Sequence, residues 1–257
     1  MGQEGSIAIG LVDAIPIATV TFLAALVQGV LGFGFTLLAI SFFLIFVGSA
    51  AIPLLVMLNL AITLVLAPPL WRHVPGRLWL TIVAGAMFGF PLGIVAFGAA
   101  DIDHLKIAAG VVVVTLACLV WLDVSIVPNT VRRGSNHRTA WSAGTGVISG
   151  FMATALGMPG PILVLYLSGL GLEKNVIRAI AITFLALSYS VAMLLHATLY
   201  TIEAEVWITA VLLLPVAAIG SWSGHLLAPR VGYQAFRQAV LVLITGSGIY
   251  TIISALN

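Results

Sequence analysis

Long stretches without charge are the feature that most constrains this chain. The 36 residues from 12 to 47 contain one charged side chain, Asp13, and other apolar runs recur as far as residue 255. A helix needs about 18 or more apolar residues to cross roughly 30 Å of hydrocarbon. Only 7% of the 257 residues are charged, whereas a soluble domain has about 25%. The sequence therefore predicts an all-α polytopic membrane protein.

Ten helices are predicted from the runs that are free of strong charge. Their ranges are 12–31, 35–47, 50–71, 78–100, 104–122, 140–156, 161–171, 176–200, 205–228 and 233–255. At about 1.5 Å per residue, the segments 35–47 and 161–171 reach only about 20 Å and about 17 Å, which is too short to cross the membrane. These two segments are interpreted as half-helices.

The one extended polar stretch, Asp123 to Trp141, divides the chain into halves of similar length. We predict three regions: a first membrane repeat over 1–127, a cytoplasmic linker over 128–139 and a second membrane repeat over 140–257.

The two halves resemble each other in sequence. "RLWLTIV" at 77–83 matches "EVWITAV" at 205–211, and "GVLGFGF" at 29–35 matches "GFMATALGMPGP" at 150–161. In both halves a glycine-rich break comes early and three long helices follow. Repeats of this kind are typical of secondary transporters, whose site lies where the repeats meet.

The basic residues decide between parallel and inverted repeats. If each early segment crosses the membrane once, the ten Lys and Arg residues divide five and five. If each is a hairpin that returns to its own side, nine lie on one side and only Lys106 opposite, as the positive-inside rule requires. We therefore predict inverted-topology repeats in the cell (inner) membrane, with both termini outside. The nine residues are Arg72, Arg77, Arg132, Arg133, Arg138, Lys174, Arg178, Arg230 and Arg237.

The two helix breaks are the predicted substrate site. Unpaired backbone groups at membrane depth cost several kcal/mol each unless they face protein or a wet cavity. In an inverted pair the two tips approach the midplane, where each begins a half-helix with free N–H groups and a positive dipole end. Converging helix N-termini make an anion site. The candidate binding residues are Gly32, Phe33, Gly34, Phe35 and Thr36 at the first tip, and Gly157, Met158, Pro159 and Gly160 at the second, where Ile162 and Leu163 would direct N–H groups.

Neutral polar side chains near mid-span are further candidates, because no Lys or Arg lies deep in a predicted span. Asn59 in the first half and Ser188 and Tyr189 in the second lie at equivalent positions, while Gln28, Ser149 and Thr154 flank the tips. Two plainer interpretations stay open: interhelical hydrogen bonds for these side chains, and close helix packing for the glycines. His196 is the one histidine considered for proton handling.

Other function classes lack their signatures in this sequence. An ATP-binding loop of the form G-x-x-x-x-G-K-[ST] and clustered metal ligands are missing. The Gly-x-Ser-Gly of a rhomboid-like protease is missing as well. We expect no enzyme, no cofactor, no metal and no nucleic-acid partner. The predicted partners are a small anion and the lipid bilayer, and the oligomeric state stays open.

Two stretches carry a family resemblance that extends over essentially the whole chain. "GVLGFGFTLLAI" and "GVISGFMATALGMPGPILVLYLSGLGLEKNVIRAIA" resemble the TauE/SafE family of sulfite and organosulfonate exporters. The resemblance implies transport of small sulfur-containing anions such as sulfite, sulfoacetate or thiosulfate. Members often have a denser glycine run at the two tips than this chain has. A transporter or channel for another small anion or a neutral solute is the alternative.

Overall fold

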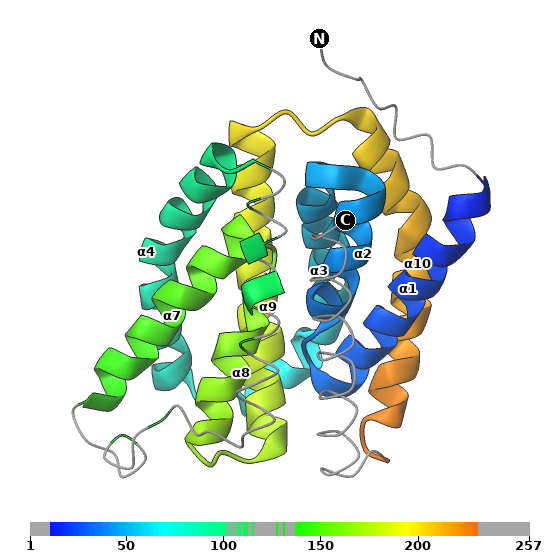
Figure 1. Ribbon diagram of the computed structural model, residues 1–257. Coiled ribbons are helices and arrows are strands. Elements are labelled where there is room, and N and C mark those ends of the chain that lie inside the picture. Colours follow the sequence, from blue (N-terminus) through cyan, green and yellow to red (C-terminus); the bar gives the residue numbers. More distant parts are fainter. Residues whose placement is uncertain are drawn as a thin grey trace.

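The computed structural model describes residues 11–101, 104, 107, 108, 110–112, 115, 127, 131 and 137–230. Every regular element in this part of the chain is helical. The predicted helix 233–255 lies outside the described residues, as does most of 104–122. The main helices are α1 (Leu11–Leu31), α2 (Phe35–Val47), α3 (Ala51–Leu66), α4 (Gly76–Ala99), α7 (His137–Ala155), α8 (Gly160–Gly169), α9 (Lys174–Leu199) and α10 (Ala204–Leu227) (Figure 1).

One predicted helix is too long. The sequence predicts 50–71, but α3 ends at Leu66 and the chain continues as the 3-10 helix η2 (Pro68–His73). Proline has no N–H to donate, and its ring clashes with the preceding turn. Pro68 and Pro69 therefore end α3, and an apolar run alone did not reveal this.

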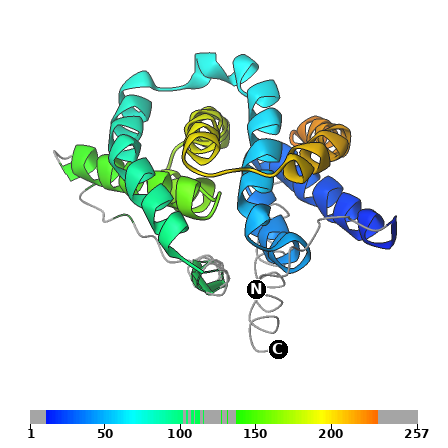
Figure 2. The same cartoon turned by 90° about the horizontal axis from the view of Figure 1, so that it is seen from above.

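Helix partners are exchanged between the two predicted halves. α1 packs along α10, and α4 packs along α7, while α3 and α9 meet in the centre. Seen from above, the α4 and α7 pair and the α1 and α10 pair lie on opposite sides of α9 (Figure 2). Each pair joins the first helix of one half to a later helix of the other.

Glycines hold both pairs at close range. A Cβ added at Gly85 or Gly89 of α4 would collide with the backbone of α7 at Ala143 or Val147. A Cβ at Gly224 of α10 would collide with the backbone of α1. Small residues commonly allow such approach in membranes. These packing glycines lie away from the two breaks, so they leave the interpretation of the break glycines open.

Within the described residues, three helices, α4, α9 and α10, are long and apolar enough to cross a membrane, and α2, α3, α8 and part of α1 are shorter apolar helices. The outer faces of α4 and α10 are themselves apolar. Phe88 is 73% exposed and Leu212 is 69% exposed. Large apolar side chains in such numbers on the outside suit contact with lipid chains rather than water.

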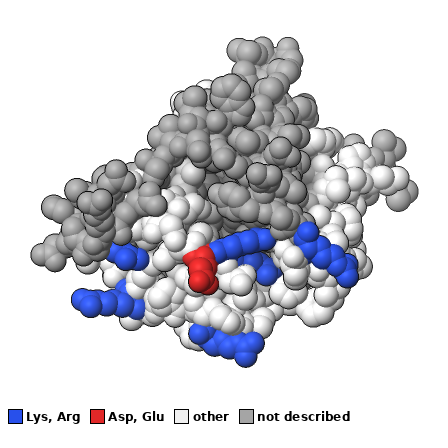
Figure 3. All heavy atoms as spheres, turned by 90° about the horizontal axis from the view of Figure 1, so that it is seen from below, with Lys and Arg blue, Asp and Glu red and all other residues white. Residues whose placement is uncertain are grey.

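The charged side chains gather at the ends of the helices. Every described Lys and Arg lies in or beside η2, the beginnings of α4, α7 and α9, or the end of α10. These ends lie at the bottom of Figure 1, and the view from below shows the basic side chains on that face (Figure 3). The opposite end carries Asp101, Glu203 and Glu205, beside the end of α4 and the beginning of α10.

Candidate functional site

Two helix breaks lie where the glycine-rich stretches predict them. α1 ends at Leu31 and α2 begins at Phe35, with Gly32 at φ 85° and Gly34 at φ 110° between them. α7 ends at Ala155 and α8 begins at Gly160, with Gly157 at φ 65°. Glycine adopts positive φ without the steric cost of a Cβ. In Figure 1, α2 turns back toward the end where α1 begins, and α8 turns back toward the end where α7 begins.

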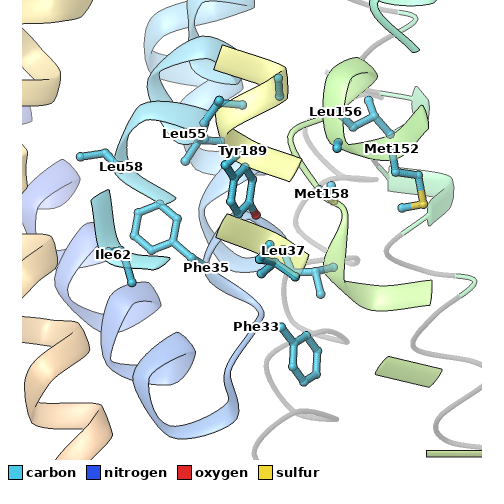
Figure 4. Packing of buried hydrophobic residues seen from close by; sticks show 14 of the residues in the cluster. Phe33, Phe35, Leu37, Leu55, Leu58, Ile62, Met152, Leu156, Met158 and Tyr189 are labelled. Carbon is cyan, nitrogen blue, oxygen red and sulfur yellow. The ribbon is translucent and has the colours of Figure 1, made fainter. Parts of the chain in front are cut away.

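The tips of the two breaks touch each other. A Cβ added at Gly160 would lie 3.2 Å from the Cβ of Phe33 and 3.6 Å from Cδ1 of Leu185 in α9. The structure thus brings these candidate residues of both tips together. Phe33, Phe35, Met158 and Tyr189 lie in one buried cluster with residues of α3 (Figure 4).

Hydrogen bonds and a close contact join three helices to the second tip. Asn59 in α3 donates from Nδ2 to Oγ1 of Thr36 in α2, at 2.9 Å. The Thr36 side chain also lies beside the Tyr189 side chain of α9. The Tyr189 hydroxyl donates to the carbonyl oxygen of Gly157, at 3.3 Å. Four candidates proposed from the sequence therefore lie in direct contact.

One expectation about the first tip is wrong. The sequence predicts a free N–H at Phe35, but this N–H donates to Oε1 of Gln28 at 3.1 Å. Gln28 lies in the last turns of α1, so its side chain can reach across the break and cap α2. Among the described residues, no acceptor is found for the N–H groups of Thr36 and Ile162 in the first turns of α2 and α8.

Several buried polar atoms have no hydrogen-bond partner within the described residues. They include Nε2 of Gln28, Oδ1 of Asn59, and the hydroxyl oxygens of Ser149 and Ser188. All four side chains are at most 1% exposed. Buried polar atoms nearly always have partners, and one without a partner costs about 1–3 kcal/mol. Gln28 and Asn59 place their unpartnered atoms beside the beginning of α2, where a polar ligand would satisfy them.

His196 holds the last turn before the second break. Its Nε2 donates to the carbonyl oxygen of Thr154, at 2.9 Å. The ring packs edge-on against Phe97, with the centroids 4.6 Å apart, and is 1% exposed. Thr154 in turn donates from Oγ1 to the carbonyl oxygen of Phe90 in α4, at 2.9 Å. This is a structural contact, and proton handling by His196 stays a prediction.

Arg178 is a residue of the site region that the sequence interpretation missed. It is half-buried, and its Nη2 donates to the carbonyl oxygen of Gly29 at 2.7 Å and lies 2.9 Å from Nδ1 of His225. Its Cγ would lie 2.9 Å from a Cβ added at Gly32. From the sequence, Arg178 is used only in the count of basic residues that predicts the topology, although it is the one Lys or Arg within the predicted helix 176–200.

The buried polar side chains of the described residues include no Lys, Arg, Asp or Glu. No group of three His, Cys, Asp or Glu that could hold a metal ion occurs in this part of the chain. A ligand between the tips would therefore meet helix N-termini, amides and hydroxyls, with the half-buried Arg178 beside Gly32 as a nearby cation. Helix N-termini bind small anions without an ion pair.

Comparison with known proteins gives one result. The family described as sulfite exporter TauE/SafE matches residues 17–251. No curated protein and no solved structure matches the chain. The match extends over all but the first 16 and the last six residues, so the resemblance inferred from the glycine-rich stretches is confirmed. This chain belongs to the TauE/SafE sulfite exporter family.

Proposed function

We propose that this protein is a secondary transporter that exports small sulfur-containing anions, such as sulfite, sulfoacetate or thiosulfate, through the cell (inner) membrane. Membership of the TauE/SafE family supports the class of cargo. The apolar outer faces of α4 and α10 support a multi-pass position in the membrane.

The observation that carries the proposal is the contact between the two tips. Gly160 lies against Phe33, and beside this contact the N–H of Thr36, the N–H of Ile162 and Nε2 of Gln28 have no acceptor within the described residues. The N-terminal ends of α2 and α8 add positive dipole ends. An anion placed between these groups would satisfy several donors at once, because every one of them is an N–H.

The charge of the cargo, and the lack of a buried Asp, Glu or Lys among the described residues, support export. A membrane potential of about 100 mV, inside negative, contributes about 2.3 kcal/mol per charge toward moving an anion outward. Proton-coupled uptake would need a titratable group on the path. Among the described residues, His196 is the buried histidine nearest the second tip, and it is occupied with the carbonyl of Thr154.

The proposal includes two inverted-topology repeats with both termini outside. Two features of the fold support it. The reciprocal pairing of α1 with α10 and of α4 with α7 is what a two-fold relation between the halves would produce. The basic side chains gather at one end of the molecule, as they do on the cytoplasmic side of membrane proteins.

Sulfite efflux from proteoliposomes tests the proposal. We expect Gly34→Val and Gly160→Val to abolish efflux, because Gly34 has φ 110° and Gly160 already contacts Phe33. Gly144→Val is the matched control, since a Cβ at Gly144 of α7 meets nothing within 4 Å. All three variants are first checked for a monodisperse, folded protein in detergent.

Two outcomes would contradict the proposal. Normal efflux of sulfite by both folded valine variants would show that the tips do not form the site. Efflux of an uncharged solute of similar size at the rate of sulfite would show a transporter or channel without anion selectivity.

A further inference from the structure

The orientation of the Asn59 carboxamide is fixed by its neighbours. Its Nδ2 donates to the carbonyl oxygen of Leu55, at 2.7 Å, and to Oγ1 of Thr36, at 2.9 Å. A backbone carbonyl oxygen can only accept, so the atom facing Leu55 must be the nitrogen. The unpartnered atom of Asn59 is therefore Oδ1, a buried acceptor.

The hydroxyl groups near Asn59 do not satisfy its Oδ1. Tyr189 donates its hydroxyl hydrogen to the carbonyl oxygen of Gly157, and each hydroxyl carries one hydrogen. The Thr36 oxygen accepts from Nδ2 of Asn59. Oδ1 of Asn59 therefore has no partner within the described residues.

The free donor lies on Gln28. Its Oε1 accepts the N–H of Phe35, so Nε2 is the unpartnered atom of this amide. The beginning of α2 thus has a buried side-chain donor on α1 and a buried side-chain acceptor on α3. A fully ionised oxyanion would satisfy the donor and be repelled by the acceptor.

One cation, Arg178, lies beside the first tip, and it is already bound to other groups. α2 and α3 contain no titratable side chain. From α9 the site meets the Tyr189 hydroxyl, while His196 is bound to the carbonyl of Thr154. Arg178 of α9 donates to the carbonyl oxygen of Gly29 and contacts His225 of α10, and its buried Nε has no partner within the described residues. The desolvation cost of an ion grows with the square of its charge, so a dianion costs about four times as much as a monoanion.

We propose that the site selects a singly charged oxyanion that keeps one O–H group. The charged oxygens accept from Nε2 of Gln28 and from N–H groups of α2, and the O–H group donates to Oδ1 of Asn59. Among the protonation states of the proposed cargo, this ligand is hydrogensulfite rather than sulfite. The inference rests on the function proposed above and adds the protonation state of the cargo.

Binding measured against pH tests the selection. We expect the apparent affinity for total sulfite, measured by calorimetry on the purified protein in nanodiscs, to fall by about tenfold per pH unit above the second ionisation of sulfurous acid. Methanesulfonate stays a monoanion without an O–H group across that range. Its binding should be weaker than that of hydrogensulfite and constant with pH, which separates titration of the ligand from titration of the protein.

A pair of variants sharpens the test. Gln28→Glu keeps an oxygen to cap Phe35 but replaces the free donor with an acceptor, and we expect at least about a tenfold loss of binding for hydrogensulfite and methanesulfonate alike. Thr63→Val is the control, because the Thr63 hydroxyl donates only within α3, to the carbonyls of Asn59 and Leu60. Its affinities should match those of the unchanged protein.

Three outcomes are distinguishable. Falling affinity for total sulfite with constant methanesulfonate binding supports the inference. Sulfite affinity that is flat with pH, or sulfate that binds as tightly as hydrogensulfite, overturns it and leaves anion transport standing. No binding of any sulfur anion at any pH overturns both this inference and the proposed function.

Discussion

The two breaks perform the same turn with different means. At the first, side chains hold the chain: Gln28 caps the N–H of Phe35, and Asn59 binds Thr36. At the second, the backbone and two prolines contribute more: the N–H of Met158 donates to the carbonyl of Met152 at 2.9 Å, and Pro159 and Pro161 fix φ, while the Tyr189 hydroxyl donates to the carbonyl of Gly157. The first break therefore has the unpartnered amide atoms of Gln28 and Asn59 beside it, and the second is shaped mainly by its own backbone.

Each break also has an anchor, a side chain of α9 that binds a backbone carbonyl in the helix turn before the break, and the anchor of the first break is the stronger donor. Near the amino end of α9, the charged Arg178 donates to the carbonyl of Gly29 in α1. Near its carboxyl end, His196 donates to the carbonyl of Thr154 in α7. Basic side chains are favourable at the C-terminal ends of helices. One helix thus ties down the turn before each break, more strongly at the first.

The largest effect should come from the glycines themselves. Gly32→Ala should lower the free energy of unfolding by about 3 kcal/mol, and Gly157→Ala by about 1–2 kcal/mol, because both need positive φ but only Gly32 has Arg178 within 2.9 Å of the new Cβ. Denaturant unfolding in detergent measures both. Equal losses would mean that the stem of Arg178 moves aside freely.

The anchors should come next. Arg178→Met should lower stability by about 2 kcal/mol, since it removes a charged donor, and His196→Phe by about 1 kcal/mol, since it removes a neutral one. Arg230→Met is the control for lost charge, because Arg230 is exposed at the same end of the molecule. A larger loss for His196→Phe than for Arg178→Met would reverse the comparison between the two anchors.

The smallest effects should come from the caps. Gln28→Ala should cost about 1 kcal/mol, the usual value for loss of a helix cap, together with most of the anion affinity. Pro161→Ala should cost about 0.5 kcal/mol through the greater freedom of the unfolded chain, with affinity retained. Thermal unfolding and calorimetry on the same samples measure both quantities. If Pro161→Ala loses anion affinity and Gln28→Ala keeps it, the anion binds at the second break and not at the first.

Elements that depend on composition could be predicted from the sequence. The apolar runs gave the helices, and the clustered glycines gave both breaks, because few other residues permit positive φ at Gly32, Gly34 and Gly157. The end of the predicted helix 50–71 could have been placed before Pro68, since proline in the sequence indicates the end of a helix. The inverted topology and the roles assigned to the site residues stay predictions.

Contacts across a break could not be predicted in this way. Gln28 reaches Phe35 only because the chain reverses at Gly32 and Gly34 and brings the end of α1 beside the beginning of α2. Arg178 reaches Gly29 because α9 packs beside that turn. Both contacts depend on side-chain direction in the assembled bundle, which neither hydropathy nor the spacing of residues specifies.

The exchange of helices between halves has a mechanical consequence. Gly85 and Gly89 allow α4 to pack against the backbone of α7, and Gly224 allows α10 to pack against the backbone of α1. Two helices whose backbones pack this closely can slide or separate only by losing many contacts. Any rocking that opens the molecule alternately to its two sides must therefore turn α4 together with α7, and α1 together with α10. The units that move in such a rocking would then be these two helix pairs.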